Sequence, residues 1–560
     1  MSMSTEVGRN VPASESTDAP IAPYRADWRR GRVTSWLTTV DHKRIGVMYL
    51  VTSLGFFAFA GLLALIMRAQ LAEPNNTVVT RGSYNEVATV HGTTMVFLVA
   101  APLLVGLANF LVPLMIGARR MAFPRLNALA YWFYVLAGAL LVLSLLAKNG
   151  GPQAGWTSPV PLSTLHADGR GQDMWIVGLY VLTLSSLAAA ANLIVTLTNM
   201  RTRGMVWTRL PLFAWASFIS SWLLVVALPA LAAGLTMLLL DRHANTHFFD
   251  PSRDGSNELY RHIFWFYGQP QLYALIIPAM GIVSEIIPVF SRKPIFGYRP
   301  IVLSSIALAV FGVLTWGQHL FIGGLGTTAG TVFMILSLAS AIPVGVKIFN
   351  WLATLWRGNI SFDTPMLWAI GFIALFTVGG LSGVLLSVFP VDRQLGGTYF
   401  VVAHLHYVLF GGALFAIFGG LYYWWPKIFG RMLDDRLGRL HFWLVFLGFN
   451  LAFLPQFFLG LLGMPRHTHT YASGGLRETY NMISTIGSFT LALGMLVFLA
   501  NVVRTSRVGR RAVNDPWLAD TLEWYATSPP PPWNFDRIPY IVGSRPLRDL
   551  RRRLTAERRM

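Results

Sequence analysis

Twelve long apolar stretches, separated by polar loops, constrain the fold of this chain more than any other feature. Each reaches the roughly 20 residues that a helix needs to cross a bilayer. With 54% hydrophobic and only 12% charged residues, the chain is far too apolar for a soluble domain. The sequence therefore predicts an all-α membrane protein with about twelve transmembrane helices. The stretches lie near residues 45–66, 90–116, 128–147, 174–200, 212–239, 260–290, 299–324, 330–350, 365–389, 399–425, 441–463 and 482–503.

Basic residues gather in alternate loops and near both ends of the chain. Because cytoplasmic loops of membrane proteins are enriched in Lys and Arg, we predict that these loops and both termini are cytoplasmic, in a prokaryotic-type inner membrane. The net charge of +19 then reflects contact with anionic lipid, and no nucleic-acid partner is expected. We divide the chain into a disordered cytoplasmic tail (1–35), a membrane domain (36–504) and a cytoplasmic extension (505–560). The basic loop residues include Arg119, Arg120, Arg125, Arg201, Arg203, Arg209, Arg292, Lys293, Arg299, Arg357, Lys427, Arg431, Arg436 and Arg439.

The chain contains no cysteine. It therefore cannot form a disulfide, an iron–sulfur cluster or a thiolate-bridged copper centre from its own residues. If it handles electrons, they arrive from a partner subunit or a soluble carrier. The longer outer loops, at residues 67–89, 148–173, 240–259 and 464–481, are the expected place for that partner to dock.

Three histidines lie in or beside apolar stretches, where ionisable groups are costly and usually functional. His404 and His406 are two residues apart, so on a helix their side chains point about 200° apart, to opposite flanks. His91 begins another apolar stretch. Two of these imidazoles can ligate one haem from both sides while the third takes a second haem on one side only. The alternative is that they are buried histidines bonded to the backbone.

Several sequence strings, in order, resemble one family. From about Trp36 to Arg504 the chain is similar to subunit I of the haem–copper oxidases, in particular the cytochrome c oxidase type. The resemblance implies twelve helices that hold a low-spin haem beside a high-spin haem facing a copper ion. It also implies that His91 and His406 ligate the low-spin haem and His404 the high-spin haem. The strings are VDHKRIG from Val40, PLMIGA from Pro113, MAFPRLN from Met121, SRKPIFGY from Ser291, GVKIFNW from Gly345, FTVGGLSG from Phe376 and GLLGMPR from Gly460.

Other cofactor contacts follow from the same resemblance. Arg68 matches an arginine that contacts a polar substituent of the low-spin haem, which suits a haem of the a type. Trp156 and Arg466 match residues near the haem propionates, although both types are also common interfacial anchors. His467 stands where the family often has a second arginine. Gly396 and Gly397 replace the family's magnesium-binding His-Asp pair, so we expect no magnesium there.

The copper site departs most from the family pattern. Gln269 and Gln318 occupy two of the three positions where the family has histidine, and His319 keeps the third. An uncharged carboxamide oxygen is a poor ligand for copper, so we expect little or no copper to bind. Tyr273 is retained one helical turn after Gln269, but an amide cannot form the family's covalent bond to it. Tyr273 is then either a donor of a proton or an electron, or a buried phenol bonded to Gln269 or to a haem substituent.

The proton pathways are also altered. The family's carboxylates at one pathway's two ends are replaced by Arg120 and Gln271, although Asn127 between them is kept. A second pathway in the family uses a lysine that matches Lys347, which lies in an apolar stretch. Glu285 is a candidate partner for that lysine, and snorkelling to the cytoplasmic face is the alternative.

These observations predict a membrane respiratory oxidoreductase subunit that passes electrons through a low-spin haem to a high-spin haem where oxygen is reduced. Copper binding is expected to be impaired, and proton pumping is in doubt. Two other hypotheses stay open. One is a non-catalytic haem protein that carries electrons, senses a gas or regulates a partner, and the other is a reductase of nitric oxide or a similar gas. Expected partners are lipid, other oxidase subunits, an external donor that is subunit II-like or cytochrome c-like, and a small gas.

Overall fold

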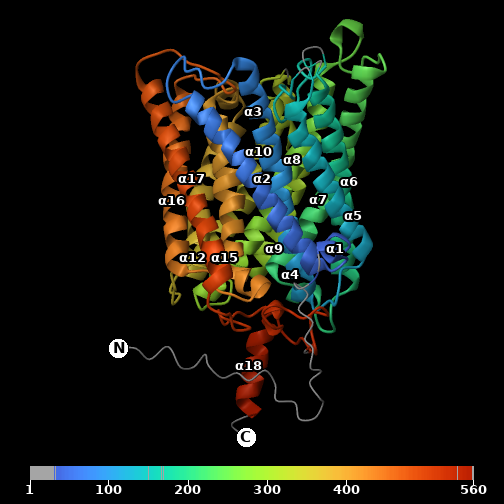
Figure 1. The fold of residues 1–560 in the computed structure, drawn as a ribbon, viewed down its shortest axis with the longest axis vertical. Coiled ribbons are helices and arrows are strands. Elements are labelled where there is room, and N and C mark those ends of the chain that lie inside the picture. The colour runs from blue at the N-terminus through green and yellow to red at the C-terminus, as the bar shows by residue number, and fades with distance from the viewer. Residues whose placement is uncertain are drawn as a thin grey trace.

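The protein folds into a bundle of near-parallel helices, with the chain's first and last helices at the same end (Figure 1). The structure is a computed structural model that describes residues 31, 33–148, 150–164, 167, 169–323, 325–538 and 540–557. The described residues contain no β-strand, only two isolated bridges. The disordered tail predicted over residues 1–35 lies almost entirely outside the described residues.

Twelve helical segments in the described residues are long and apolar enough to cross a membrane, which confirms the predicted number. They are His42–Gln70 (α2), Arg81–Ile116 (α3 Arg81–Thr93, η1 Thr94–Ala100, α4 Ala101–Ile116), Pro124–Leu146 (α5 Pro124–Leu143, η2 Ser144–Leu146), Arg170–Asn199 (α6), Leu212–His243 (α7), Asn257–Phe290 (α8), Tyr298–Leu320 (α9 Tyr298–Leu314, η5 Trp316–Leu320), Thr327–Leu355 (α10 Thr327–Ala339, α11 Ala341–Leu355), Thr364–Ser387 (α12), Tyr399–Phe429 (α14 Tyr399–Val408, η6 Leu409–Leu414, α15 Phe415–Phe429), Asp435–Leu461 (α16) and Leu476–Val508 (α17).

Polar caps fix where the site-bearing helices begin. The Oγ1 of Thr80 accepts a hydrogen bond from the Ser83 amide at the start of α3, and Ser256 caps α8 in the same way through the Leu259 amide. Thr398 caps α14 by accepting from the Phe400 amide. Such caps satisfy amides that have no partner inside the helix. They therefore set the register of the histidines and glutamines that follow.

The spans differ in how far protein encloses them. Arg81–Ile116 and Asn257–Phe290 are mostly buried within the bundle, whereas the most apolar part of Thr327–Leu355 is largely exposed. Helices that are apolar all round and central are surrounded by other helices, and the exposed apolar faces of the others suit contact with lipid. The two central spans carry His91 and Gln269, so the candidate site lies inside the bundle.

The segment after α17 packs against one end of the bundle. The Nζ of Lys427 donates to the carbonyls of Ala526 (2.6 Å) and Asn514 (3.0 Å), and the Nζ of Lys43 donates to the Pro532 carbonyl (2.9 Å). Helix α18 (Pro546–Glu557) then projects beyond that end (Figure 1). The two short helices α1 (Val33–Leu37) and α18 thus share one side, as expected for an even number of crossings.

Candidate functional site

Two large cavities meet inside the bundle, each about 1060 Å³ in volume. His404 lines the first, and His91 and His406 line the second. The two-residue spacing of His404 and His406 on α14 therefore places their side chains in different cavities. The cavities adjoin, because both are lined by Trp156, Val401, Leu405, Leu409, Arg466 and His467.

All three histidines use Nδ1 for a hydrogen bond to a backbone carbonyl. His404 Nδ1 also lies 3.0 Å from Ser382 Oγ, whose hydroxyl donates to the Gly379 carbonyl and can therefore accept from the ring. Such a bond fixes Nδ1 as the protonated nitrogen and leaves the lone pair of Nε2 free, which is the arrangement expected of a histidine that ligates a metal. His406 is further oriented by Phe453, whose ring lies 4.1 Å away and nearly parallel. The bonds are His91 to Ala60 (2.9 Å), His404 to Gly379 (3.1 Å) and His406 to Val402 (2.7 Å).

Arg68 is buried at the wall of the second cavity, at 7% exposure. Its Nη2 donates to the carbonyl of Asn481 (2.7 Å) and to Thr485 Oγ1 (3.1 Å), while Nε and Nη1 have no partner among the described residues. Buried donors are normally satisfied, so two unpartnered guanidinium nitrogens call for a polar acceptor on whatever fills this cavity. A haem with a polar ring substituent supplies one.

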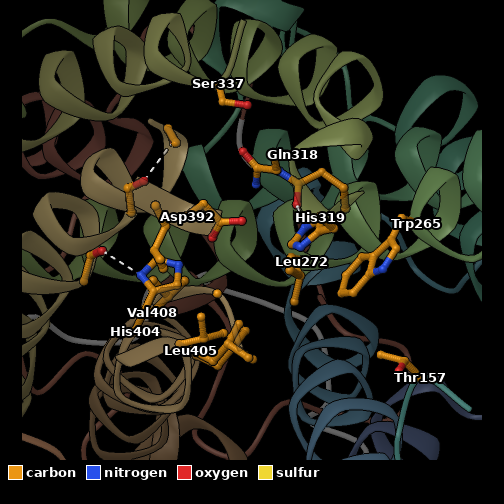
Figure 2. Close-up of a pocket in the computed structure, with 18 of the residues that line it drawn as sticks. Thr157, Trp265, Leu272, Gln318, His319, Ser337, Asp392, His404, Leu405 and Val408 are labelled. Atoms are coloured by element: carbon orange, nitrogen blue, oxygen red, sulfur yellow. Dashed lines mark hydrogen bonds between the residues drawn. The ribbon is translucent and has the colours of Figure 1, made fainter. Parts of the chain in front are cut away.

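The end of the cavities near Arg466 is polar and carries groups of opposite charge. Arg466 and His467 line both cavities, and Asp392, on α13 (Phe389–Leu395), lines the first (Figure 2). Burial raises the pKa of the Asp392 carboxyl to about 7, although nearby Arg466 opposes the shift. The cationic Arg466 can pair with carboxylate groups of a cofactor that spans this end, while Trp156 packs between the cavities.

The wall opposite His404 is formed by glutamine, histidine and tryptophan (Figure 2). The Nε2 of His319 donates to Oε1 of Gln269 at 2.6 Å, and the His319 ring stacks on Trp265 with 3.7 Å between ring centroids. Gln318 lines the same cavity. No cluster of three or more His, Cys, Asp or Glu side chains suited to a metal occurs in the described part of the chain. This wall offers one imidazole, that of His319, whose Nε2 is already bonded to Gln269.

Tyr273 also lines this cavity, and its hydroxyl does not bond to Gln269. Its hydroxyl donates to Oγ of Ser340 at 3.4 Å, while Gln269 turns its amide N–H toward Thr315 (3.1 Å). The tyrosine and the glutamine are one helical turn apart, yet each finds its partner on a different neighbouring helix.

Lys347 is fully buried, and its Nζ donates to Oγ of Ser305 at 2.5 Å. The expected ion pair with Glu285 is wrong, because the Oε1 of Glu285 accepts from the Phe213 amide (3.2 Å) instead. The snorkelling alternative is equally unsupported, since the lysine has 1% exposure. In the first proton pathway, which runs from Arg120 to Gln271, both polar atoms of the Asn127 side chain are buried without a partner among the described residues.

Two features of the site carry no clear signal in the sequence. Short π-helical segments follow the histidines, η1 three residues after His91 and η6 three residues after His406. A π-turn adds one residue to a helical turn and occurs often at functional sites. Asp392 was also missed, although its place shortly before the paired glycines and α14 could have indicated the cavity mouth.

Comparison with known proteins decides the family. The model of the cytochrome c and quinol oxidase polypeptide I family matches residues 44–490. The chain is 46% identical to the cytochrome c oxidase subunit 1 of Bacillus subtilis (strain 168), over 93% of this chain and 83% of that protein. It is also 46% identical to a probable cytochrome c oxidase subunit 1-beta of Nocardia farcinica, over 96% and 92%.

The chain belongs to the cytochrome c and quinol oxidase polypeptide I family. A solved heme-copper terminal oxidase dimer has the same fold, with a TM-score of 0.70 at 17% identity over 89% of this chain and 88% of that one. As a polypeptide I, the chain is a multi-pass membrane subunit of a respiratory electron-transport oxidoreductase, and the family implies haem cofactors.

Proposed function

We propose that this chain is subunit I of a terminal oxidase in a bacterial cytoplasmic membrane. It holds a low-spin haem between His91 and His406 and a high-spin haem on His404, and it passes electrons toward oxygen. The observation that carries this proposal is the shared geometry of the three histidines, whose Nδ1 atoms bond to backbone and whose Nε2 atoms are left free at two adjoining cavities. Haem, when bound, supplies iron that accepts electrons and binds a gas.

The surrounding residues support two haems rather than another ligand. Arg68 offers two unsatisfied guanidinium nitrogens, Nε and Nη1, to a polar ring substituent, which favours a haem of the a type. Arg466 stands at the shared mouth of the cavities, where it can pair with propionates. Leu405 lies between the two histidines on α14 and lines both cavities, so haems held in the two cavities would lie close together.

Copper binding is impaired in this proposal. Gln269 and Gln318 supply carboxamides where copper prefers imidazole nitrogen or sulfur, and the remaining His319 already bonds to Gln269. Loss of even a residue that orients a metal ligand costs about 10-fold to 100-fold in affinity, so the loss of two direct ligands costs more. A magnesium site at Gly396 and Gly397 is also not expected, since neither residue has a ligating side chain.

Proton delivery is reduced to one route. Arg120 and Gln271 leave no carboxylate at either end of the first pathway. The amide of Asn127, which has no hydrogen-bond partner among the described residues, therefore has no carboxylate to which it could relay a proton. Lys347, bonded to Ser305, is the ionisable group retained on the second pathway. Protons consumed at the site can arrive past Lys347, and coupled pumping is not expected. Electrons enter from a subunit II-like or cytochrome c-like donor on the outer side.

The test is metal analysis and an optical spectrum of the purified complex. We expect two irons per chain with less than one-tenth equivalent of copper, and oxygen uptake with a reduced donor. His404→Leu should remove the high-spin haem and leave the low-spin spectrum intact, with His441→Gln as a control, because His441 is buried but lines neither cavity. Copper near one per two irons would show the copper assignment to be wrong. A preparation with no haem would overturn the proposal.

A second candidate is a haem protein that transfers electrons or binds a gas without reducing oxygen. It is favoured by the hydrogen bond between His319 and Gln269, because two side chains that bond to each other then occupy the expected copper position. Two haems without copper, together with no oxygen uptake above that of His404→Leu, would select this candidate.

A further inference from the structure

The wall opposite His404 carries a chain of hydrogen bonds whose direction is fixed. It runs from His319 Nε2 to Gln269 Oε1 (2.6 Å), from Gln269 Nε2 to Thr315 Oγ1 (3.1 Å), and from Thr315 Oγ1 to the Phe311 carbonyl (2.7 Å). A backbone carbonyl can only accept, so the threonine hydroxyl donates to it and receives its own bond from the glutamine amide. The amide must then turn its oxygen toward His319.

This order selects one tautomer of His319. Because the Gln269 oxygen can only accept, Nε2 of His319 carries the proton and Nδ1 carries the lone pair. The stack on Trp265, with ring planes 12° apart, holds the imidazole in that orientation. Among the described residues, Nε2 of this ring makes a hydrogen bond and Nδ1 makes none, and His319 lines the first cavity. Nδ1 is therefore the ring nitrogen left to accept a hydrogen bond from a molecule in that cavity.

The other polar groups of this wall either interact with other residues or contain both hydrogen-bond donors and an acceptor. The Tyr273 hydroxyl bonds to Ser340, and Asp392 lies near Arg466 at the mouth. Gln318 lines the cavity with an amide that has both donors and an acceptor. His319 is thus the group with a fixed, unbonded acceptor, and it faces the space across from His404 (Figure 2).

We propose that His319, held by Gln269 and Trp265, is the positioning residue for a small protic ligand on the open side of the high-spin haem. Its Nδ1 accepts a hydrogen bond from the ligand, so the site favours molecules such as hydrogen peroxide or water over aprotic gases. The former copper position thereby serves as a hydrogen-bonding pocket made of side chains alone. This inference rests on the proposed haem at His404.

Carbon monoxide bound to the reduced protein tests the direction of the bond. A lone pair near the ligand oxygen opposes the build-up of negative charge there and strengthens the C–O bond, whereas an N–H group weakens it. We expect the C–O stretch of the wild type to lie at higher frequency than that of His319→Leu. In Gln269→Leu the ring is free to change tautomer and donate, so its band should lie below that of the wild type.

A wild-type band equal to or below that of His319→Leu would overturn the proposal. Gln318→Leu is the matched control, since it removes a neighbouring amide from the same wall, and it should keep the order of the other bands. The two-haem spectrum of each variant is recorded first. If the haems are absent, the proposed function fails; if they are present and the bands are in the wrong order, this inference alone fails.

Reaction with hydrogen peroxide gives an independent readout. The rate at which peroxide changes the spectrum of the oxidised protein should fall about threefold to tenfold in His319→Leu, the worth of one neutral hydrogen bond. The rate of carbon monoxide binding to the reduced protein should not fall in the same variant. Equal loss of both rates would indicate general damage to the cavity and would contradict the proposal.

Discussion

At the scale of single residues, the partner of each ring nitrogen separates the three expected haem ligands from His319. His91, His404 and His406 give Nδ1 to backbone carbonyls and keep Nε2 free. His319 instead gives Nε2 to a glutamine side chain. Histidine therefore has two roles within this site, a proposed haem ligand or a hydrogen-bond donor to a glutamine. The partner of its ring nitrogens decides between them.

Removal of His91 is predicted to abolish the low-spin haem signal. In His91→Leu the second cavity loses one of its two imidazoles, and an iron held by His406 alone has an open position. We expect the low-spin signal of the spectrum to be lost while the high-spin signal stays. Reduced-minus-oxidised spectra and haem extraction measure this, with His441→Gln as the buried control. An unchanged low-spin band would contradict the ligand assignment.

Gly383 is predicted to be essential for the position of His404. A Cβ placed on Gly383 would lie 3.0 Å from Cε1 of the His404 ring, closer than most real contacts, so the ring would have to shift. In Gly383→Ala we expect a changed high-spin spectrum and weaker carbon monoxide binding, by several fold. Gly55→Ala is the control, because a Cβ at that helical glycine meets nothing within 4 Å. If both variants had the same high-spin spectrum and the same carbon monoxide binding, the His404 ring could move without consequence, and the prediction would be wrong.

At the scale of elements, the C-terminal segment is a structural part of the bundle's end. Glu523, in η7 (Leu522–Tyr525), has no exposed surface, and its Oε1 accepts from Trp424 (3.2 Å) and Thr521 (2.8 Å). Its Oε2 has no partner among the described residues. Burial raises the pKa of this carboxyl to about 7, despite these bonds and nearby Lys427.

The raised pKa makes docking of this segment dependent on pH. The docked carboxyl keeps its proton to about pH 7, whereas a free one loses it near its ordinary value of 4.5, so docking is strongest below pH 4.5 and weakens as pH rises to about 7. The gap corresponds to roughly 3 kcal/mol at most. We expect faster amide exchange of residues 514–534 at pH 8 than at pH 5, after correction for the intrinsic rate.

Glu523→Gln should abolish that difference, since an amide makes similar hydrogen bonds without ionising. Asp254→Asn, in an exposed loop between α7 and α8, should leave it unchanged. A pH response that persists in Glu523→Gln would assign the effect to another group.

At the scale of the whole molecule, the distribution of arginine and lysine predicts which end of the bundle faces the cytoplasm. The chain has no cysteine, so one introduced thiol reports on one position alone. Thr208, in the loop between α6 and α7, and Ala472, between α16 and α17, are both exposed and lie on opposite sides of the bundle by the order of the spans.

A membrane-impermeant maleimide should label Ala472→Cys in intact cells and Thr208→Cys only after the membrane is opened. The cysteine-free parent is the control for background labelling. Labelling of Thr208→Cys in intact cells would reverse the predicted orientation and place both termini outside.

Much of the fold was predictable because membrane helices follow from local composition. About 20 apolar residues must form a helix in lipid, where each backbone group needs an internal partner. The number of spans and the separation of His404 from His406 follow from this and from helical periodicity alone. Contacts between spans do not follow from composition or periodicity. Glu285 was expected near Lys347, yet it bonds to the backbone of α7, because distances between helices depend on packing that no single stretch encodes.

By itself, the sequence determined that this protein crosses the membrane twelve times and which residue types reach its interior, since these depend on short-range hydrophobicity and helical spacing. The tertiary structure alone decided which atoms of those residues stay free. Three kinds of atom are available only because other segments of the chain occupy, or fail to occupy, the neighbouring hydrogen-bonding positions: Nε2 of three histidines, Nε and Nη1 of Arg68, and Nδ1 of His319.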